Sequence, residues 1–359
     1  MRRNEIISLL KENDQQEIER LFAKADRARA SQVGPQVHLR ALLEISSHCR
    51  RDCAYCGLRA SNRNLKRYRM RSRAIIAAAE RGAQLGYGTV VLQAGEDLGL
   101  RRARISSLIR RIRTETGMAV TLSLGERSAA DLAAWREAGA LRYLLRFETS
   151  DQRLLRSVHP PLRSNHEPHP RLALLSLLRE LGYETGGGVM VGLPGQSYGT
   201  LADDILTFGS LELDMTGVGP WVPHPDTPLG KTGFPDNPEQ VPNSAEMTLK
   251  VIALARLARP TSNIPATTAL ATVGGENLLA KALSCGANVI MPDMTPPRFR
   301  EGYSIYPGKS GFFQQAASQD KELKKVIVSI GRTVGVGAGN SPSYEHRRTQ
   351  QPAAAAGGL

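Results

Sequence analysis

"VHLRALLEISSHCRRDCAYC", residues 37–56, decides between two folds that the rest of the chain allows. Its first ten residues form a largely apolar run that predicts a buried β-strand. Three cysteines, Cys49, Cys53 and Cys56, follow directly. A doubly wound open sheet would have a glycine-rich GxGxxG turn after an early strand. The cysteine loop therefore favours a barrel, in which chemistry lies on the loops that leave the carboxyl ends of the strands.

The remaining chain alternates between short apolar runs and longer helical patterns. Several helical patterns end at a glycine suited to a left-handed C-terminal residue, namely Gly86, Gly117, Gly139, Gly182 and Gly286. The strand candidates cover residues 37–46, 89–95, 119–125, 142–149, 185–193, 216–223, 264–270 and 287–292. Eight strands separated by helices predict an α/β protein with a complete (β/α)8 TIM-type barrel.

Three regions follow from this pattern. Residues 1–36 predict an N-terminal helical extension, and residues 37–330 predict the barrel. Residues 341–359 are small and polar without periodicity, so we expect a disordered tail. No apolar run approaches the ~18 residues of a membrane span, and the N-terminus lacks a signal-peptide core. We therefore expect a soluble cytoplasmic protein without a membrane partner.

The net charge of +13 raises the question of a nucleic-acid partner. Residues 63–73 and 101–113 are strongly basic, but the second stretch has isoleucines and leucine at helical spacing, which is typical of an amphipathic helix with a solvated arginine face. Aromatic residues are only 5% of the chain, and no basic strand is interleaved with them as in proteins that stack bases. An acidic protein partner suits the charge equally well.

Three clustered thiols in a reducing compartment indicate metal binding or catalysis rather than disulfides. A structural zinc ion normally takes four ligands, and here the fourth would be His48 or a distant residue. The C-x3-C-x2-C spacing better suits a cubane iron–sulfur cluster with three irons held by thiolates and the fourth open. Zinc remains the alternative.

The loop from Cys49 to Cys56, with Tyr55 before its last cysteine, resembles the signature of the radical S-adenosylmethionine (SAM) superfamily. The resemblance implies that Cys49, Cys53 and Cys56 are the metal ligands and catalytic centre of a 4Fe–4S cluster, and that SAM binds the open iron. Reductive cleavage of SAM would then give a 5′-deoxyadenosyl radical. The resemblance also implies SAM contacts from Tyr55, Gln93, Gly95, Glu96, Glu148, Arg171, Gly192 and Pro194. The glycines from Gly186 onward would let the backbone approach the adenine.

More specific strings are PHPDTPL (223–229), SNIPATTA (262–269) and GANVIMP (286–292), which are similar to the HydE family of FeFe-hydrogenase maturases. That resemblance, from about residue 37 to 308, implies assembly of the H-cluster di-iron site from a small anionic substrate, an iron-cyanide-carbonyl-cysteine synthon. Maturase partners and an electron donor would bind transiently. The implied substrate residues are Thr121, Ser123, Arg146, Thr267, Thr268, Met291, Tyr303 and Tyr306. Methylornithine synthase-like and biotin synthase-like activities, and a non-enzymatic iron–sulfur or zinc protein, stay open.

Some features depart from the family pattern. Phe147 stands between Arg146 and Glu148, where strand alternation points it away from the site. The loop after Arg156 carries His159, His166 and His169 at irregular spacing, which we interpret as an exposed loop. Cysteines near the C-terminus for a second cluster are missing, so we expect a single cluster, with Cys285 packed against the eighth strand.

Overall fold

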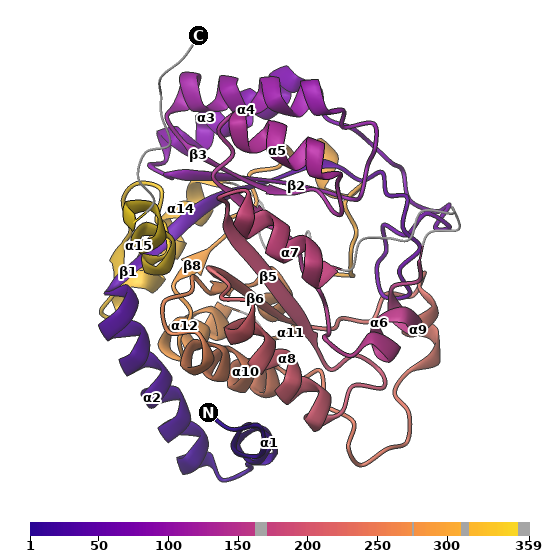
Figure 1. The fold of residues 1–359 in the computed structure, drawn as a ribbon, viewed down its shortest axis with the longest axis vertical. Helices are drawn as coiled ribbons and strands as arrows, with labels where there is room; N and C mark the ends of the chain where they lie inside the picture. The colour runs from indigo at the N-terminus through magenta and orange to yellow at the C-terminus, as the bar shows by residue number, and fades with distance from the viewer. Residues whose placement is uncertain (162–170, 275, 310–315, 351–359) are drawn as a thin grey trace.

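The computed structural model describes residues 1–161, 171–274, 276–309 and 316–350, which form a ring of parallel strands covered by helices (Figure 1). The strands run in the order β6-β5-β4-β3-β2-β1-β8-β7, with β9 paired to β1 outside this path. Their bounds are β1 Gln36–Ser46, β2 Thr89–Ala94, β3 Ala119–Ser123, β4 Arg142–Leu144, β5 Glu184–Val191, β6 Met215–Pro220, β7 Pro265–Ala266, β8 Val289–Ile290 and β9 Thr333–Val334.

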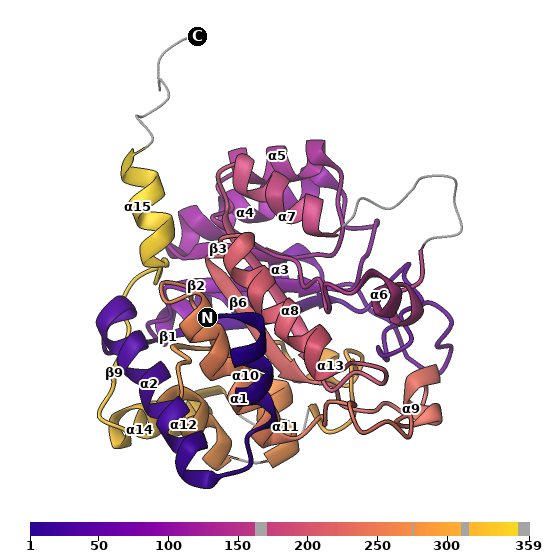
Figure 2. The ribbon, with the colours of Figure 1, turned by 60° about the horizontal axis from the view of Figure 1, so that its bottom comes forward.

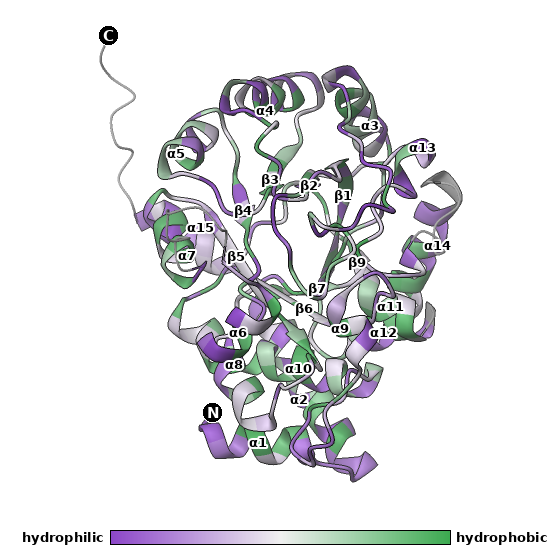
Figure 3. Cartoon of the chain, turned by 90° about the vertical axis from the view of Figure 1, so that its right-hand side faces the viewer, coloured by the Kyte–Doolittle hydropathy of each residue, from purple (hydrophilic) through white to green (hydrophobic). Residues whose placement is uncertain are grey.

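The ring closes between β6 and β7. This seam has no ladder of its own among the described residues, and is joined instead by a parallel bridge between Met215 and Asn263. The structure thus confirms the predicted α/β barrel, nearly closed around one apolar interior. Figure 3 views the molecule with helices α3, α4, α5 and α7 outside the strands.

The helices alternate with the strands as the pattern predicted. α1 Arg3–Lys11 and α2 Gln15–Val33 precede the barrel, and α3 Ser72–Gln84, α4 Arg102–Thr116, α5 Ala129–Glu137, α6 Gln152–Val158 and α7 Arg171–Glu180 cover its first half. The second half carries α8 Tyr198–Ser210, α9 Pro228–Thr232, α10 Ala245–Ala258, α11 Thr268–Gly274, α12 Glu276–Ser284, α13 Pro297–Arg300, α14 Ala316–Ser329 and α15 Pro342–Gln350.

Local sequence explains most of these helices. In α4, Ile105, Leu108, Ile109 and Ile112 are buried, which confirms the amphipathic pattern in the second basic stretch. The five glycines predicted to end helices all have positive φ, from 68° at Gly117 to 126° at Gly286. α1 and α2 lie along α8 and α10 (Figure 1), with Ile6 and Leu10 fully buried. No described helix is long and apolar enough to cross a bilayer.

Most of the predicted strands end earlier than expected at the carboxyl end of the barrel, as β4, β7 and β8 illustrate. β4 stops at Leu144, and Glu148 lies in the left-handed region with φ of 64° and only an isolated bridge to Val189. The seventh strand was predicted to reach residue 270, but Thr268 begins α11, and the eighth stops at Ile290. The backbone stops pairing with neighbouring strands at these positions because its side chains point into a cavity.

The predicted disordered tail is wrong for residues 342–350, which form α15 beside the barrel (Figure 2). Tyr344 is buried, and Arg347 forms an ion pair with the buried Asp214 at 2.6 Å. The composition suggested disorder because the segment is polar. The barrel residues that pair with its side chains lie far away in the sequence, so no local pattern revealed them. Residues 351–359 lie outside the described part of the chain.

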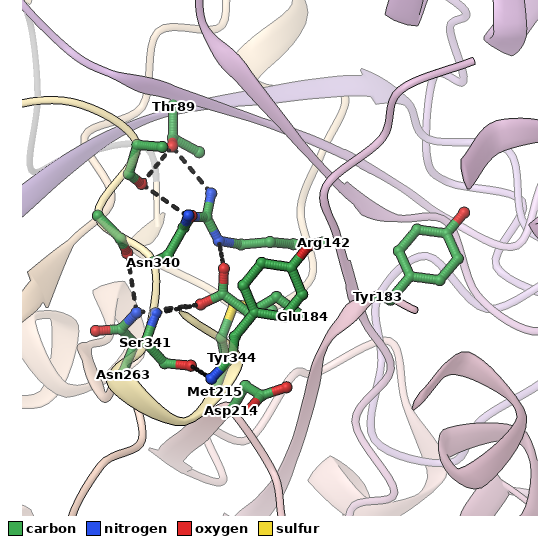
Figure 4. A network of polar contacts seen from close by, with 12 residues as sticks. Thr89, Arg142, Tyr183, Glu184, Asp214, Met215, Asn263, Asn340, Ser341 and Tyr344 are labelled. Atoms are coloured by element: carbon green, nitrogen blue, oxygen red, sulfur yellow. Dashed lines mark hydrogen bonds and ion pairs between the residues drawn. The ribbon is translucent and has the colours of Figure 1, made fainter. Parts of the chain in front are cut away.

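The segment before α15 closes the amino end of the barrel with a buried polar network (Figure 4). Arg142, the first residue of β4, forms an ion pair with Glu184, the first residue of β5, and both side chains are fully buried. Arg142 also donates to the carbonyl of Ala338 at 2.8 Å, and the backbone N–H of Ser341 donates to Glu184 at 2.9 Å. The C-terminal segment therefore supplies acceptors and donors to charges inside the barrel.

Candidate active site

A cavity of about 300 Å³ opens at the carboxyl ends of the strands, opposite this network. All three cysteines of the motif line it. So do residues from β2, β3, β5 and β6 and from the segments after β4, β7 and β8. The strand-end loops of a barrel converge on one face, which explains why residues more than two hundred positions apart meet here.

The cysteine loop is fixed by backbone contacts on both sides. The N–H of Arg50 donates to the carbonyl of Glu96 at 3.1 Å, and the N–H of Ala54 donates to that of Val158 at 2.8 Å. Arg67, in the basic stretch 63–73, donates to the carbonyls of Ser47, Leu58, Arg59 and Asn62. Part of that stretch therefore supports the loop rather than facing solvent.

The surroundings of the cysteines disfavour free thiolates. Burial, together with the neighbouring cysteines, raises the pKa of Cys56 to about 12 and that of Cys53 well above its ordinary value. Three thiolates gathered at one cavity need nearby cationic charge, and metal ions supply it. Among the described residues, no three His, Cys, Asp or Glu side chains converge tightly enough for one metal ion. An iron–sulfur cluster fits the cavity-lining thiols better, because each thiolate binds a different iron.

A buried charged network lies beside the cysteines. Glu126, after β3, accepts from Arg51 and, at 2.9 Å, from Arg171. Burial alone would raise its pKa, but contact with His159 and the charges of Arg171 and Arg51 lower it to about 2. Glu96 accepts from Arg51 at 3.0 Å. The network ties the cysteine loop to the loops after β2 and β3 and to α7.

Besides Nε of Arg146, which faces Glu148, two donors in the cavity wall lack a hydrogen-bond partner within the described residues. Nη1 of Arg51 and Nε1 of Trp221 are buried without a hydrogen-bond acceptor in the part of the chain that the structure describes. Both residues are 2% exposed and both line the cavity. A buried donor without an acceptor is costly, so a ligand that offers acceptors, such as SAM with its carboxylate and adenine, fits this wall.

Arg146 and Glu148 both face the cavity, and Phe147 points away to pack on Phe208 of α8, as predicted. Nε of Arg146 lies 3.1 Å from Oε2 of Glu148. The left-handed backbone at Glu148 replaces the strand alternation on which the prediction rested, yet it brings the carboxylate to the same side.

In a second part of the cavity wall, Thr268 and Tyr306 share a hydrogen bond of 2.9 Å between their hydroxyls. Thr267 instead donates to the carbonyl of Val218 at 3.2 Å. Lys309 completes this wall and forms an ion pair with the buried Glu44. Burial raises the pKa of Glu44 to about 8, although the charge of Lys309 opposes this. The wall thus combines hydroxyl and cationic donors.

Most residues predicted to contact ligand line this one cavity. Those from the SAM prediction are Tyr55, Gln93, Glu96, Glu148 and Arg171, and those from the substrate prediction are Ser123, Arg146, Thr267, Thr268, Met291, Tyr303 and Tyr306. Four others are not among its lining residues: Gly95, Thr121, Gly192 and Pro194. Thr121 is buried deeper in the barrel, and its hydroxyl has no partner within the described residues.

The glycines have packing roles. A Cβ at Gly95 would lie 2.4 Å from the carbonyl oxygen of His48, so this glycine lets the second strand-end loop approach the cysteine loop. Cβ atoms at Gly186 and Gly188 would meet Met215 and the Gly217 carbonyl of β6. Neighbouring protein therefore occupies the space beside Gly186 and Gly188, and the approach of this strand to an adenine stays a prediction.

The interpretation of His159 as part of an exposed loop is also wrong. Its side chain is 8% exposed and lines the cavity, with Nδ1 2.9 Å from Sγ of Cys53. Burial, with the charges of Arg171 and Arg51, lowers its pKa. His166 and His169 lie outside the described residues. Cys285 is buried, with Sγ 3.4 Å from the carbonyl of Ala282.

Sequence reasoning also missed Arg51, Glu126, Trp221 and Lys309. Glu126 offered a usable signal, because an acidic residue shortly after a predicted barrel strand lies on the face that carries the chemistry. Arg51 lies inside the cysteine motif itself. Trp221 and Lys309 have no such local signal, since only the closed barrel brings them to the cavity.

Comparison with known proteins agrees with this geometry. Residues 43–207 match the model of the Radical SAM superfamily. The FeFe hydrogenase maturase subunit HydE of Thermotoga maritima is 46% identical over 325 residues, covering 90% of this chain and 89% of that protein. The 3-methylornithine synthase of Methanosarcina acetivorans is 27% identical over 344 residues, covering 95% of this chain and 91% of that protein.

Solved structures show the same fold. Methylornithine synthase (PylB) superposes with a TM-score of 0.79 at 23% identity, covering 93% of this chain and 94% of that one. The FeFe-hydrogenase maturase HydG from Carboxydothermus hydrogenoformans gives 0.73 at 18% identity, covering 92% and 75%. At these identities the likeness concerns the barrel alone.

Proposed function

This chain belongs to the HydE family of the radical SAM superfamily, and from that premise we propose that it holds one 4Fe–4S cluster on Cys49, Cys53 and Cys56 and acts in assembly of the FeFe-hydrogenase di-iron site. As a radical SAM enzyme it uses an iron–sulfur cluster and SAM. The observation that supports the finer proposal is the placement of three cysteines, Glu148 and Arg171 around one cavity at the strand ends.

Bound there, the cluster and SAM would supply a 5′-deoxyadenosyl radical by one-electron reduction of the sulfonium. This chain's residues have separate parts in that process. Glu148 offers a carboxylate to the SAM ribose or ammonium, and Arg171 offers a guanidinium to its carboxylate. The carboxylate of Glu96, by contrast, already accepts from Arg50 and Arg51, so its part is to hold the cysteine loop.

The substrate would occupy the wall formed by Arg146, Thr268, Met291 and Tyr306. Hydroxyl and guanidinium donors beside a thioether and the apolar cavity wall suit a small anionic complex such as an iron-cyanide-carbonyl-cysteine synthon. The surrounding barrel excludes water from the reacting atoms. A reducing cytoplasm would keep the thiols available, and the net charge of +13 suits a transient acidic partner.

Reconstitution tests the chemistry. The protein is loaded with iron and sulfide without oxygen, reduced with dithionite and supplied with SAM, and 5′-deoxyadenosine is measured by chromatography. We expect 5′-deoxyadenosine to form. A fully loaded cluster that yields none would contradict the radical mechanism.

The maturase role needs a separate test. Expression of this chain should restore FeFe-hydrogenase activity to a cell whose own HydE has been deleted, and the Cys53→Ala variant should not. Restoration would support the maturase proposal. A chain that cleaves SAM but never restores hydrogenase activity would favour a different small substrate, as in the 3-methylornithine synthase relative.

A further inference from the structure

His159 lies between a cluster cysteine and the arginine proposed for SAM. It follows α6 directly, and its backbone N–H donates to the carbonyl of Leu155 at 2.7 Å, which fixes the start of the side chain. Nδ1 lies 2.9 Å from Sγ of Cys53, and Nε2 lies 2.9 Å from Nη2 of Arg171. Nη2 of Arg171 and the hydroxyl of Tyr55 each lie 3.4 Å from Nδ1 as well, so the ring contacts all three groups.

The partners of the ring determine where its proton lies. A cluster-bound thiolate carries no proton and can only accept, so a hydrogen bond between Nδ1 and Cys53 Sγ requires the proton on Nδ1. An imidazole whose Nε2 accepts carries its single proton on Nδ1. The carboxylate of Glu126 lies near the same ring nitrogen, with Oε1 3.6 Å from Nε2, and it accepts from Arg171 at 2.9 Å. Nδ1–H therefore points at the sulfur of Cys53.

The tautomer is held by a chain of fixed contacts. Arg171 donates through Nε to Glu126 and through Nη1 to the carbonyl of Arg146, which leaves Nη2 for His159. Glu126 is in turn held by Arg51 within the cysteine motif. The guanidinium cannot rotate without breaking three contacts, so the orientation of the imidazole is set by residues on three different elements.

We propose that His159 is a positioning residue that donates Nδ1–H to Cys53 Sγ, raises the reduction potential of the cluster and couples it to Arg171. This inference rests on the cluster assignment above. A hydrogen bond to a thiolate ligand withdraws electron density from sulfur, and so favours the reduced cluster. Through Nε2, the same ring orients the guanidinium that is proposed to bind the SAM carboxylate.

Two substitutions separate the two contacts. In His159→Asn the amide nitrogen can take the place of Nδ1–H and still donate to Cys53, but the short side chain does not reach Arg171. In His159→Gln the longer side chain can still accept from Arg171 but has no donor at the position of Nδ1. His159→Ala removes both contacts. His224→Ala is the matched control, because His224 is equally buried and its ring nitrogens contact the N–H of Asp226 at 3.1 Å and the hydroxyl of Ser304 at 3.4 Å rather than a thiol.

The readout is the midpoint potential of the reconstituted cluster, followed by electron paramagnetic resonance, together with SAM affinity. Iron content and circular dichroism first establish loading and folding. We expect a more negative potential in His159→Gln and His159→Ala, and a value near that of the native protein in His159→Asn and His224→Ala. SAM affinity should fall at least several-fold in His159→Asn and His159→Ala but not in His159→Gln.

An unchanged potential in loaded His159→Gln and His159→Ala would overturn the inference while leaving the cluster assignment intact. A native protein that takes up no cluster would overturn both. Should the variants not fold, the native protein decides: with 15N-histidine, the reduced cluster should show a nitrogen coupling and an exchangeable proton coupling. Absence of both couplings would also contradict the hydrogen bond.

Discussion

Cys53 and Cys285 are both buried thiols, but their surroundings predict opposite roles. Cys53 lines the cavity beside His159, whereas Cys285 packs in the apolar core at the end of α12. Replacing Cys53 with Ala removes one of three proposed cluster ligands, and the described cavity offers no spare cysteine in its place. We expect Cys53→Ala to lose the cluster absorbance and SAM cleavage completely.

Cys285→Ala is the control for this prediction. It deletes one sulfur from the core, at a cost of about 1 kcal/mol in the free energy of unfolding. Cluster loading and 5′-deoxyadenosine formation should match the native protein. If Cys285→Ala lost the cluster, or if Cys53→Ala kept it, the ligand assignment would have to be changed.

The same contrast shows what sequence can predict about single residues. The cysteines were recognised because their spacing is local, and their ligand role depends on that spacing. His159 was misjudged because its burial comes from contact with Cys53, 106 positions away. Its own neighbours in the chain are polar and proline-rich, as in an exposed loop. Local composition does not predict the burial of a residue whose contacts come from distant parts of the barrel.

At the scale of elements, two glycines allow the effect of backbone strain on stability to be measured apart from the effect of packing. Gly117 ends α4 with φ of 68°, and a Cβ there would meet nothing within 4 Å. Gly117→Ala should therefore cost about 1 kcal/mol through the left-handed backbone alone. The check is the free energy of unfolding in urea.

Gly209 provides the opposite case. It lies within α8 without positive φ, and a Cβ would lie 3.6 Å from the carbonyl oxygen of Ala258, an ordinary contact. Gly209→Ala should stabilise the protein by about 0.5–1 kcal/mol, because alanine favours the helix. Equal effects of the two substitutions would mean that positive φ is not what distinguishes them.

Strands and helices were predictable from sequence where one face is buried, because the apolar residues then recur with the period of the element. The prediction failed at the cavity rim, where β4 gives way to the left-handed Glu148 and where α11 begins at Thr268. These residues direct polar side chains into a cavity. Their backbone conformation follows from that orientation rather than from hydrogen bonds to a neighbouring strand. The sequence was enough to identify these residues as site candidates, but not to predict their backbone conformation.

At the scale of the whole molecule, the barrel encloses charge at its amino end. Arg40 and Arg142 are buried there, and Glu184 accepts from Arg142, Asn263 and Ser341. Glu184→Gln would leave Arg142 as a buried charge without its counter-ion. We expect a loss of about 3 kcal/mol in the free energy of unfolding, measured in urea.

An exposed ion pair serves as the comparison. Arg3 of α1 and Asp203 of α8 lie 2.6 Å apart, with side chains about half exposed. Asp203→Asn should lower the free energy of unfolding far less than Glu184→Gln, because water replaces the partner. A similar loss in both variants would show that burial of the Arg142–Glu184 pair contributes no extra stability.

The C-terminal segment should be needed for the stability of the barrel, although the composition of residues 341–359 suggested a disordered tail. A chain ending at Val334 would lose the Ala338 carbonyl that Arg142 uses, the Ser341 N–H that Glu184 uses and the Arg347 guanidinium that neutralises Asp214. Each loss leaves a buried charge with fewer partners, so the midpoint of urea unfolding should fall further than in Glu184→Gln. A chain ending at Gln350 keeps every one of these contacts, and it should unfold at a higher urea midpoint than the chain ending at Val334. Equal stability of the two shortened chains would contradict a structural role for residues 335–350.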